Sequence, residues 1–338
     1  MDTSETLPQV ISNRIKKYGG RLLLQHKDGW SWKQITWLDF EKGIKDIASF
    51  LMSLGFTPGD AALLVSGNRT ESIYAEFAIY LIGGISIPIA ENEAQDVIAR
   101  IARDSDSRFI FVSGGPALDR LRNIKDGIPS LARIISFSDA NIGDDEKVLP
   151  FKGLLKFGSI KRKGLEDELI KTAKGVLPDS PAVIFYSFNS DGGIVRKEVT
   201  HRDLVEAIRV ASDKLSFISE EDQAFSYLPS IGSFERFVNY LGIYMGIRIA
   251  IAETRKDFFE DILEVKPTVL FETKSEIENM CSKIISNLGR SSPILKLKSA
   301  LGGRVRYIII DSPPRGEIKN LFYKVGVSLI EIPELVGI

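Results

Sequence analysis

The 338-residue chain has few of the side chains that form disulfides or hold transition metals. It contains one cysteine, Cys281, and two histidines, His26 and His201. One cysteine cannot form a disulfide within the chain, so we expect a reducing compartment, the cytoplasm. Zinc sites are typically built from several Cys and His ligands, so these three residues argue against one. We assign no metal ligand and no catalytic residue from the sequence.

Charge imbalance and long apolar segments are absent as well. The formal net charge is −1 and there is no basic tail, which argues against nucleic acid as a partner. The most apolar segment, residues 79–90, is too short and too interrupted by glycine to span a bilayer. Residues 1–8 contain acidic side chains and lack the apolar core of a signal peptide. We therefore expect a protein without a membrane span.

Apolar patterning in the first half of the chain alternates between strand and helix. Short apolar runs predict strands, and apolar residues at helical spacing predict helices. The expected strands are 61–66, 85–89 and 108–112, and the expected helices are 68–81, 93–106 and 114–128. This alternation predicts an α/β fold, with mostly parallel sheets flanked by helical crossovers.

The middle of the chain contains the expected domain boundary. Residues 138–163 are charged and predicted to be largely loop, and a helix is expected from Leu165 to Lys174. The Gly-Val-Leu-Pro-Asp segment at 175–179 is typical of a linker. We therefore predict an N-terminal α/β subdomain at 1–175 and a second α/β subdomain at 176–338.

The stretch from Ile184 to His201 has the composition of a phosphate-binding loop. An apolar run that ends at Tyr186 predicts a buried strand, and residues 195–199 predict a return strand. Loop glycines let backbone N–H groups approach an anion, hydroxyls donate to it, and a basic residue neutralises its charge. The candidate loop residues are Ser187, Asn189, Ser190, Gly192 and Lys197. An ordinary hairpin connection is the alternative interpretation.

From Tyr186 to His201 the chain follows, without a gap, the pattern Y-T-S-G-T-T-G-x-P-K-G-V-x-x-T-H. Gly192 falls on a glycine of that pattern, Asp191 replaces its second threonine, and Val195 replaces its lysine. The pattern is the phosphate-binding signature of the adenylate-forming (AMP-binding) enzymes, which the chain therefore resembles. The resemblance implies the large N-terminal domain of such an enzyme, which uses ATP and Mg²⁺ to convert a carboxylate to an acyl-adenylate.

Further segments extend the resemblance over nearly the whole chain, and they look most like long-chain fatty acyl-CoA synthetases. The matching segments are 32–40, 54–60, 67–71, 83–89, 228–236 and 301–306. Within 228–236, which is similar to L-P-x-x-H-x-x-E-R, Gly232 replaces the histidine while Glu235 and Arg236 are retained. We expect Glu235 and Arg236 to form a local surface ion pair at a helix N-terminus. The resemblance places the acyl-pocket positions at Tyr227, Gly232 and Phe234.

The segments that hold adenine in the family have also changed. The adenine-loop positions, where the family has G-G-A-P-L, are Ser312, Pro313 and Pro314. Pro333 replaces a tyrosine that stacks on adenine, and Val336-Gly337 replaces the threonine–glutamate pair that holds phosphate and Mg²⁺. The resemblance also implies a small C-terminal domain with a catalytic lysine, which we expect to be absent.

These replacements lead to one main hypothesis and two alternatives. The main hypothesis is a pseudoenzyme, catalytically impaired alone, that acts as a binding or regulatory homologue with an acyl group or a nucleotide as ligand. The alternatives are a fatty acid–CoA ligase completed by another chain, with ATP or AMP and Mg²⁺ as cofactors, and a truncated ligase remnant. An apolar C-terminal edge is predicted to contact a protein partner or a second copy, or else to be buried within the monomer. Its residues are Leu329, Ile330, Ile332 and Leu335.

Overall fold

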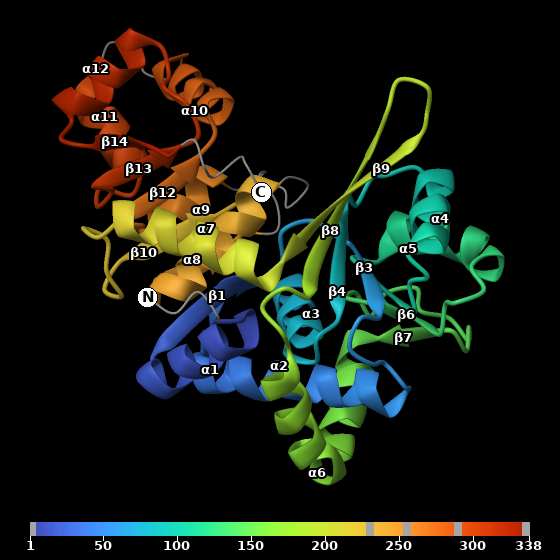
Figure 1. The fold of residues 1–338 in the computed structure, drawn as a ribbon. Coiled ribbons are helices and arrows are strands. Elements are labelled where there is room, and N and C mark those ends of the chain that lie inside the picture. The colour runs from blue at the N-terminus through green and yellow to red at the C-terminus, as the bar shows by residue number, and fades with distance from the viewer. Residues whose placement is uncertain (1–4, 228–232, 253–257, 287–292, 333–338) are drawn as a thin grey trace. The chain divides into compact units, whose positions relative to one another are not determined.

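The computed structural model describes residues 5–227, 233–252, 258–286 and 293–332, and the chain divides into two compact units (Figure 1). The first unit comprises Met1–Gly20 and Thr36–Glu206, and the second comprises Arg21–Ile35 and Ala207–Ile338. Within the described residues, each unit is built on one seven-stranded sheet.

The sheet of the first unit has the order β7-β6-β5-β3-β4-β8-β9 and is parallel except for the β8–β9 hairpin. Its strands are β3 (Ala61–Val65), β4 (Ile85–Ile89), β5 (Phe109–Val112), β6 (Arg133–Ser136), β7 (Val148–Pro150), β8 (Pro181–Phe188) and β9 (Ile194–Thr200). Its helices are α1 (Leu7–Tyr18), α2 (Trp37–Ser53), α3 (Thr70–Leu81), α4 (Gln95–Asp104), α5 (Gly115–Ile124), η1 (Lys125–Gly127) and α6 (Phe151–Gly175), and α7 (His201–Lys214) begins in this unit.

The central strands of this sheet are apolar on both faces. β3 and β5 are buried along their whole length, as expected for parallel strands covered by helices on both sides. The helix α2 begins at Thr36, whose hydroxyl accepts a hydrogen bond from the Asp39 N–H at 3.1 Å. The Asp39 carboxylate accepts in return from the Thr36 N–H at 3.0 Å, which completes a capping box.

The sheet of the second unit has the order β14-β13-β12-β10-β11-β1-β2. Its strands are β1 (Leu22–Asp28), β2 (Ser31–Thr36), β10 (Gln223–Ser226), β11 (Arg248–Ile251), β12 (Val269–Glu272), β13 (Tyr307–Ile310) and β14 (Ser328–Glu331). Its helices are α8 (Ser233–Met245), α9 (Phe258–Val265), α10 (Lys274–Ser286), α11 (Pro293–Ala300) and α12 (Gly316–Lys324). The expected α/β fold, with mostly parallel sheets flanked by helices, is confirmed.

The division into units differs from the boundary expected at Gly175. The strand β8 pairs in parallel with β4, with Val183 opposite Ser86, so the phosphate-loop-like segment belongs to the first sheet. The N-terminal strand β1 pairs in parallel with β11, with Leu24 opposite Ile249, so it belongs to the second sheet. Strand pairing between segments distant in sequence therefore sets the division, and a local linker composition does not reveal it.

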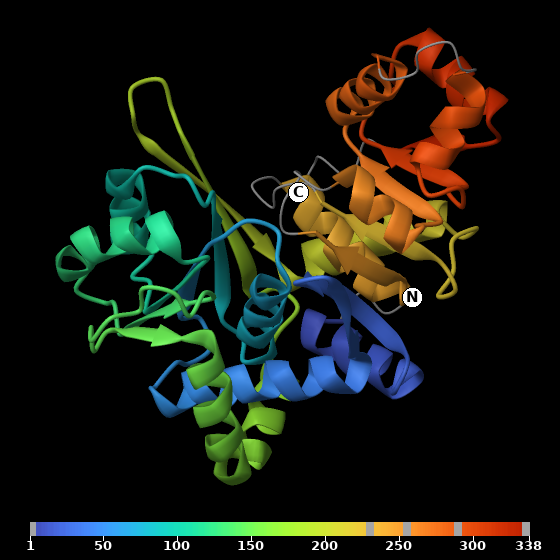
Figure 2. The same cartoon turned by 180° about the vertical axis from the view of Figure 1, so that it is seen from behind.

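The 25-residue helix α6 corrects the loop expected up to residue 163. Glycines at 153, 158 and 164 lower the helix propensity of this segment, which obscured the helix in the sequence. One of them is required by packing, because a Cβ on Gly158 would lie 1.9 Å from the Asp46 carbonyl oxygen of α2. The Arg162 Nε lies 3.0 Å from the Asp46 carboxylate. Figure 2 shows the green α6 crossing the blue α2 at this contact.

The strand β14 lies at the edge of the second sheet. Ile332, which follows it, is buried, in agreement with the alternative of burial within the monomer, whereas Leu329 and Ile330 are half-buried. Leu335 lies outside the described residues. Burial within the monomer therefore accounts for one of the four edge residues.

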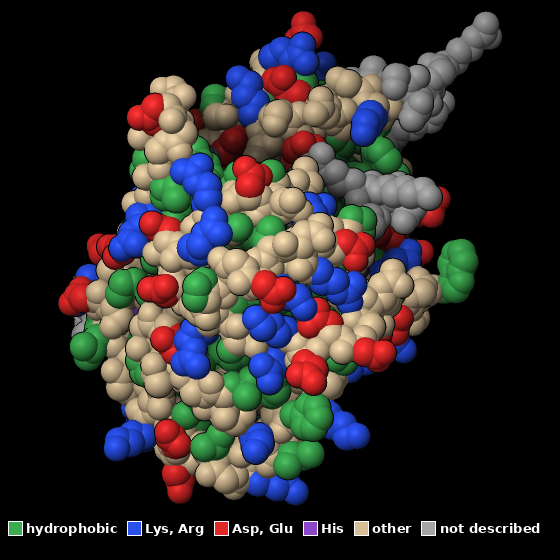
Figure 3. All heavy atoms as spheres, turned by 90° about the vertical axis from the view of Figure 1, so that its right-hand side faces the viewer, with side chains coloured by type: hydrophobic (Ala, Val, Ile, Leu, Met, Phe, Trp, Pro, Cys, Tyr) green, Lys and Arg blue, Asp and Glu red, His purple; other side chains and the backbone are tan. Residues whose placement is uncertain are grey.

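The surface carries charges of both signs. On the face seen in Figure 3, basic and acidic side chains are interspersed, in keeping with the net charge of −1. In the part of the chain that the structure describes, no helix is both long and apolar enough to cross a membrane.

The close approach of α6 to α2 predicts a stability difference between two glycines of one helix. We expect Gly158→Ala to lower the free energy of unfolding by about 2 kcal/mol or more, because the methyl group must push the helices apart. Gly164 has open space where its Cβ would lie, so Gly164→Ala should raise the stability by about 0.5–1 kcal/mol. Urea denaturation followed by circular dichroism measures both, and equal effects would contradict the packing argument.

Candidate functional site

The candidate phosphate loop is the tip of the β8–β9 hairpin (Figure 1). The antiparallel register places Ser187 opposite Val195 and Tyr186 opposite Arg196. Directly opposed residues share one face of a sheet, and successive residues alternate between faces. Ser187 and Val195 therefore lie on one face of the hairpin, and Tyr186 and Arg196 lie on the other.

The face that carries Tyr186 is held by α4. The Tyr186 hydroxyl donates to the Asp104 carboxylate at 2.7 Å, and burial together with this carboxylate raises the pKa of Tyr186 above its usual range. The Arg100 guanidinium donates to the Gly192 carbonyl at 2.9 Å and lies 5.3 Å from the centre of the Phe188 ring. These contacts tie the hairpin tip to a helix of the same unit.

Backbone donors of the loop bind the loop itself. The N–H of Asn189 donates to the Gly193 carbonyl, and the N–H of Gly192 donates to the Asn189 carbonyl, both at 2.9 Å. The N–H of Gly193 donates to the Asp191 carboxylate at 2.9 Å. Gly192 has a φ of +79°, which glycine adopts without strain, and Ser190 is exposed beside it. One backbone donor of the loop, the Gly193 N–H, is thus already bound to a negative charge of the loop itself, the Asp191 carboxylate.

The two basic residues of β9 face opposite ways. The register places Lys197 on the face of Ser187 and Arg196 on the face of α4. The Arg196 guanidinium lies 3.6 Å from the Asp104 carboxylate and 2.9 Å from the Glu198 carboxylate. Lys197, which the sequence analysis selected, is therefore the basic residue on the same face as the loop serine.

These residues do not fit a magnesium-bound triphosphate. Three loop N–H groups donate to oxygens of the loop, and Asp191 adds a negative charge beside them. Val195, exposed on the face of Ser187, occupies the position of the signature lysine. Among the described residues, no group of three or more His, Cys, Asp or Glu side chains is arranged to hold a metal ion.

His201, the last residue of the signature, is a fully buried packing residue. Its ring meets the Tyr80 ring edge-on at a centroid distance of 6.0 Å. Neither ring nitrogen has a hydrogen-bond partner within the described ranges. Burial lowers the pKa of His201 from 6.5 to about 4, so the ring is neutral at pH 7.

In the second unit, polar side chains gather at the carboxyl end of the parallel strands. The hydroxyl of Tyr227, directly after β10, donates to Glu272, the last residue of β12, at 2.7 Å. The hydroxyl of Ser226, the last residue of β10, donates to Glu235 of α8. Ligands of open α/β sheets bind at this edge, so these carboxylates belong to the candidate site.

Two of the three acyl-pocket positions, Tyr227 and Phe234, lie within the described residues. Tyr227 is 7% exposed, and its ring lies 4.3 Å from that of Phe258 and 5.7 Å from that of Phe225. Phe234 is buried at the start of α8, and Gly232 lies outside the described residues. The structure therefore places Tyr227 in an aromatic cluster.

The retained glutamate and arginine of α8 are not a surface pair. Glu235 and Arg236 are 3% and 4% exposed, which contradicts the expected exposure. Burial of a carboxylate is costly unless it is hydrogen-bonded, and the Ser226 hydroxyl supplies one bond to Glu235. Glu235 thus takes part in a buried polar contact in this chain.

The adenine-loop positions follow β13 at the same edge. The Ser312 hydroxyl donates to the Asp311 carboxylate at 3.2 Å, and that carboxylate also accepts from the Lys274 N–H at 2.8 Å. Pro313 is exposed and Pro314 is buried. Pro333, Val336 and Gly337 lie outside the described residues.

Glu272 was not among the site residues expected from the sequence. It is fully buried, and its one sequence signal is a charged residue that ends the apolar run Val-Leu-Phe. Cys281 is 1% exposed, and burial raises the pKa of its thiol to about 12, so it is a core residue and is not a thiolate nucleophile at neutral pH.

Solved structures show the class of fold. A long-chain-fatty-acid-CoA ligase (FadD1) from Archaeoglobus fulgidus superposes with a TM-score of 0.74 at 13% identity, covering 95% of this chain and 60% of that chain. The anthranilate CoA ligase AuaEII in complex with anthranoyl-AMP superposes with a TM-score of 0.76 at 14% identity, covering 97% and 60%. The chain thus has the fold of an acyl-CoA ligase N-terminal domain.

The family model described as "AMP-binding enzyme" matches residues 12–330, and the chain belongs to this family. The long-chain-fatty-acid–CoA ligase FadD15 of Mycobacterium bovis is 19% identical over 340 residues, covering 89% of this chain and 55% of the relative. The fatty acyl-CoA synthetase B of Dictyostelium discoideum is 22% identical over 372 residues, covering 96% and 54%. The chain spans about half the length of these curated relatives.

The burial of His201 predicts a pH dependence of stability. The unfolded chain takes up a proton at His201 near pH 6.5, whereas the folded chain does so near pH 4. The free energy of unfolding should therefore fall between pH 6.5 and pH 4, by about 3 kcal/mol at most. His201→Phe removes this contribution. The free energy of unfolding of the variant should therefore rise, relative to that of the unchanged protein, as the pH falls from 7 to 4. Urea titrations at pH 4, 5, 6 and 7 measure it, and parallel profiles would show that the histidine has no part in acid sensitivity.

Proposed function

We propose that this member of the AMP-binding family is a binding or regulatory homologue that does not form acyl-adenylates on its own. The observation that carries this proposal is the hydrogen bond from the Gly193 N–H to the Asp191 carboxylate. In this hydrogen bond a backbone donor of the signature loop binds a carboxylate of the same loop, so it is not available to a phosphate. Function is argued from sites and not from the fold, and this site has lost the groups that clamp phosphate.

Electrostatics adds to the loss of donors. Two like unit charges 4 Å apart repel by about 1 kcal/mol in bulk water and about 4 kcal/mol near a protein surface. Because the Asp191 carboxylate is exposed, its repulsion of a single phosphate charge is closer to the lower value. A triphosphate carries several charges, and each adds to the repulsion. The basic residue proposed to replace the signature lysine is Lys197, which shares the face of Ser187.

The proposed ligand is an acyl group, since the relatives named above are fatty acid–CoA ligases. Tyr227 and Phe234 supply apolar surface at the carboxyl end of the second sheet. The alternative, a ligase completed by another chain, needs ATP or AMP and Mg²⁺ at the loop. We propose the cytoplasm as compartment, because the chain has one cysteine and its thiol is buried.

Removing the internal anion tests the proposal. The unchanged protein should show no pyrophosphate exchange with fatty acids, ATP and Mg²⁺, and AMP should bind more weakly than millimolar in calorimetry. Asp191→Ala frees the Gly193 N–H and removes one charge, so AMP affinity should rise about fivefold or more. The control is Glu198→Ala, which removes the same charge from the same hairpin and should change little. Pyrophosphate exchange by the unchanged protein would refute the proposal and establish a ligase.

The half-buried edge of β14 supports a second, separate proposal, a homodimer. Among the described residues, β14 is an edge strand, and Leu329 and Ile330 lie on it; the backbone groups of an edge strand can pair with another strand. We expect the unchanged protein to dimerise in sedimentation equilibrium and Leu329→Lys to be monomeric. Tyr323→Lys, which replaces an 83% exposed side chain of α12, should remain dimeric. A monomeric unchanged protein at high micromolar concentration would exclude this dimer.

A further inference from the structure

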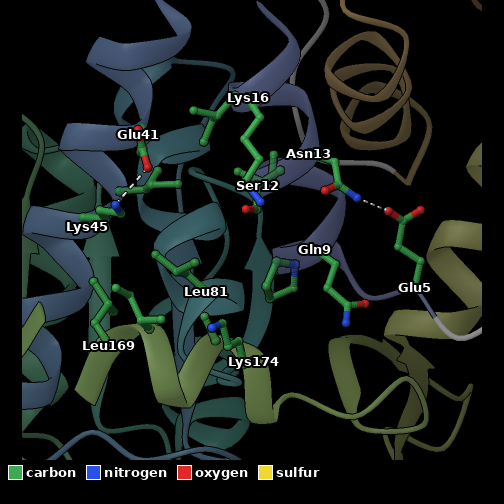
Figure 4. A pocket seen from close by; sticks show the side chains of 16 residues that line it. Glu5, Gln9, Ser12, Asn13, Lys16, Glu41, Lys45, Leu81, Leu169 and Lys174 are labelled. Carbon is green, nitrogen blue, oxygen red and sulfur yellow. Dashed lines mark hydrogen bonds and ion pairs between the residues drawn. The ribbon is translucent and has the colours of Figure 1, made fainter. Parts of the chain in front are cut away.

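The first unit contains a cavity of about 830 Å³ that the signature loop does not touch (Figure 4). Its walls come from α1, α2 and α6, with Leu81 of α3 between them. Small-molecule sites commonly enclose about 300–1,000 Å³ and combine an apolar lining with a few polar groups. The volume alone would admit a drug-sized molecule.

The floor of this cavity is apolar. Ile15 of α1, Ile44 of α2 and Leu169 of α6 line it and are otherwise buried, with exposed fractions of 8%, 1% and 1%. Ile170 also lines it and remains 41% exposed. An apolar ligand would remove the exposed surface of Ile170 from water while it packs against the other three side chains, and burial of apolar surface is the main favourable contribution to binding of this kind.

Two carboxylates in the lining are already engaged. The Glu41 carboxylate lies 2.8 Å from the Lys45 ammonium one turn further along α2. The Glu5 carboxylate accepts a hydrogen bond from the Asn13 amide at 2.9 Å, and Figure 4 draws both contacts. A polyanion such as a nucleotide triphosphate would meet these two negative charges.

Two lysines in the lining, Lys16 and Lys174, differ from these carboxylates in having no ion pair within the described residues. Lys16 extends from α1 and Lys174 from α6, so their ammonium groups approach the cavity from different helices (Figure 4). Neither has an ion-pair partner among residues 5–227, 233–252, 258–286 and 293–332. They add positive charge at the rim of an apolar floor, and this arrangement complements a molecule with one anionic end.

We propose that this cavity binds an amphipathic monoanion, an alkyl chain with a single carboxylate or sulfate group. The alkyl chain lies over Ile15, Ile44 and Leu169, and the anionic group pairs with Lys16 and Lys174. The site shares no residue with the β8–β9 loop or with the carboxyl edge of the second sheet. It is therefore a second site, distinct in its residues from those of the proposed function although the ligand class is related, and its own variants test it.

Calorimetric titration of the full chain with dodecanoate, below its micelle concentration, tests this inference. We expect one binding event that Lys16→Gln and Lys174→Gln each weaken about fivefold, as the loss of one partly exposed ion pair predicts. Ala173→Phe, which fills the cavity from α6, should abolish it. Lys171→Gln, an exposed lysine of α6 outside the lining, should leave the affinity unchanged.

Three outcomes would overturn the inference. They are no heat with dodecanoate, binding that survives Ala173→Phe, and equal effects of the Lys16, Lys174 and Lys171 substitutions. Binding that survives Ala173→Phe would place the alkyl chain elsewhere, including the edge near Tyr227. Because the lysine substitutions lie at the surface, a folding defect in Ala173→Phe would leave them to decide the question. Pyrophosphate exchange, which tests the proposed function, is independent of all these readings.

Discussion

The parallel pairing of β8 with β4 is the constraint on which the candidate loop depends. It attaches the hairpin to the first sheet, and the contacts of Tyr186 and Arg100 with α4 then hold its tip. Because β3, β4 and β8 run in the same direction, the loop after β8 emerges at the carboxyl edge of that sheet. Ligands of open α/β sheets bind at this edge, so the fold delivers the loop to a binding position whatever residues it contains.

The residues that build the scaffold of this chain and the residues of its signature loop differ in how well they follow the expected pattern. The capping box at Thr36, the apolar β3 and the glycine at 158 meet capping and packing requirements of the fold itself. The loop, by contrast, has an acid where its signature has a threonine, and a valine where it has a lysine. A stable fold therefore says little about phosphate chemistry here, and the hydrogen bonds of Asp191 say more.

Local features of the fold were predictable from sequence, and long-range contacts were not. The strand 85–89 has the expected bounds, and the helix expected at 68–81 runs from Thr70 to Leu81, because both are apolar segments with a clear stop. The helix α6 was hidden by its glycines, and the contact that requires one of them, Gly158, is with Asp46, more than 100 residues away in the sequence. The Tyr227–Glu272 contact joins residues 45 apart, and the Gly193–Asp191 bond depends on a loop conformation that composition does not specify.

The carboxylate of Asp191 acts as an intramolecular ligand of the loop, because it accepts a hydrogen bond from the Gly193 N–H. It is tethered two residues from the N–H it occupies, so its local concentration does not change when free anions are diluted. Under the proposed function, any external anion at this loop must compete with it, and the competition lowers the affinity for phosphates, carboxylates and sulfates alike. As proposed, the loop thus disfavours anions as a class, and one nucleotide change in an aspartate codon is enough to remove the competing carboxylate.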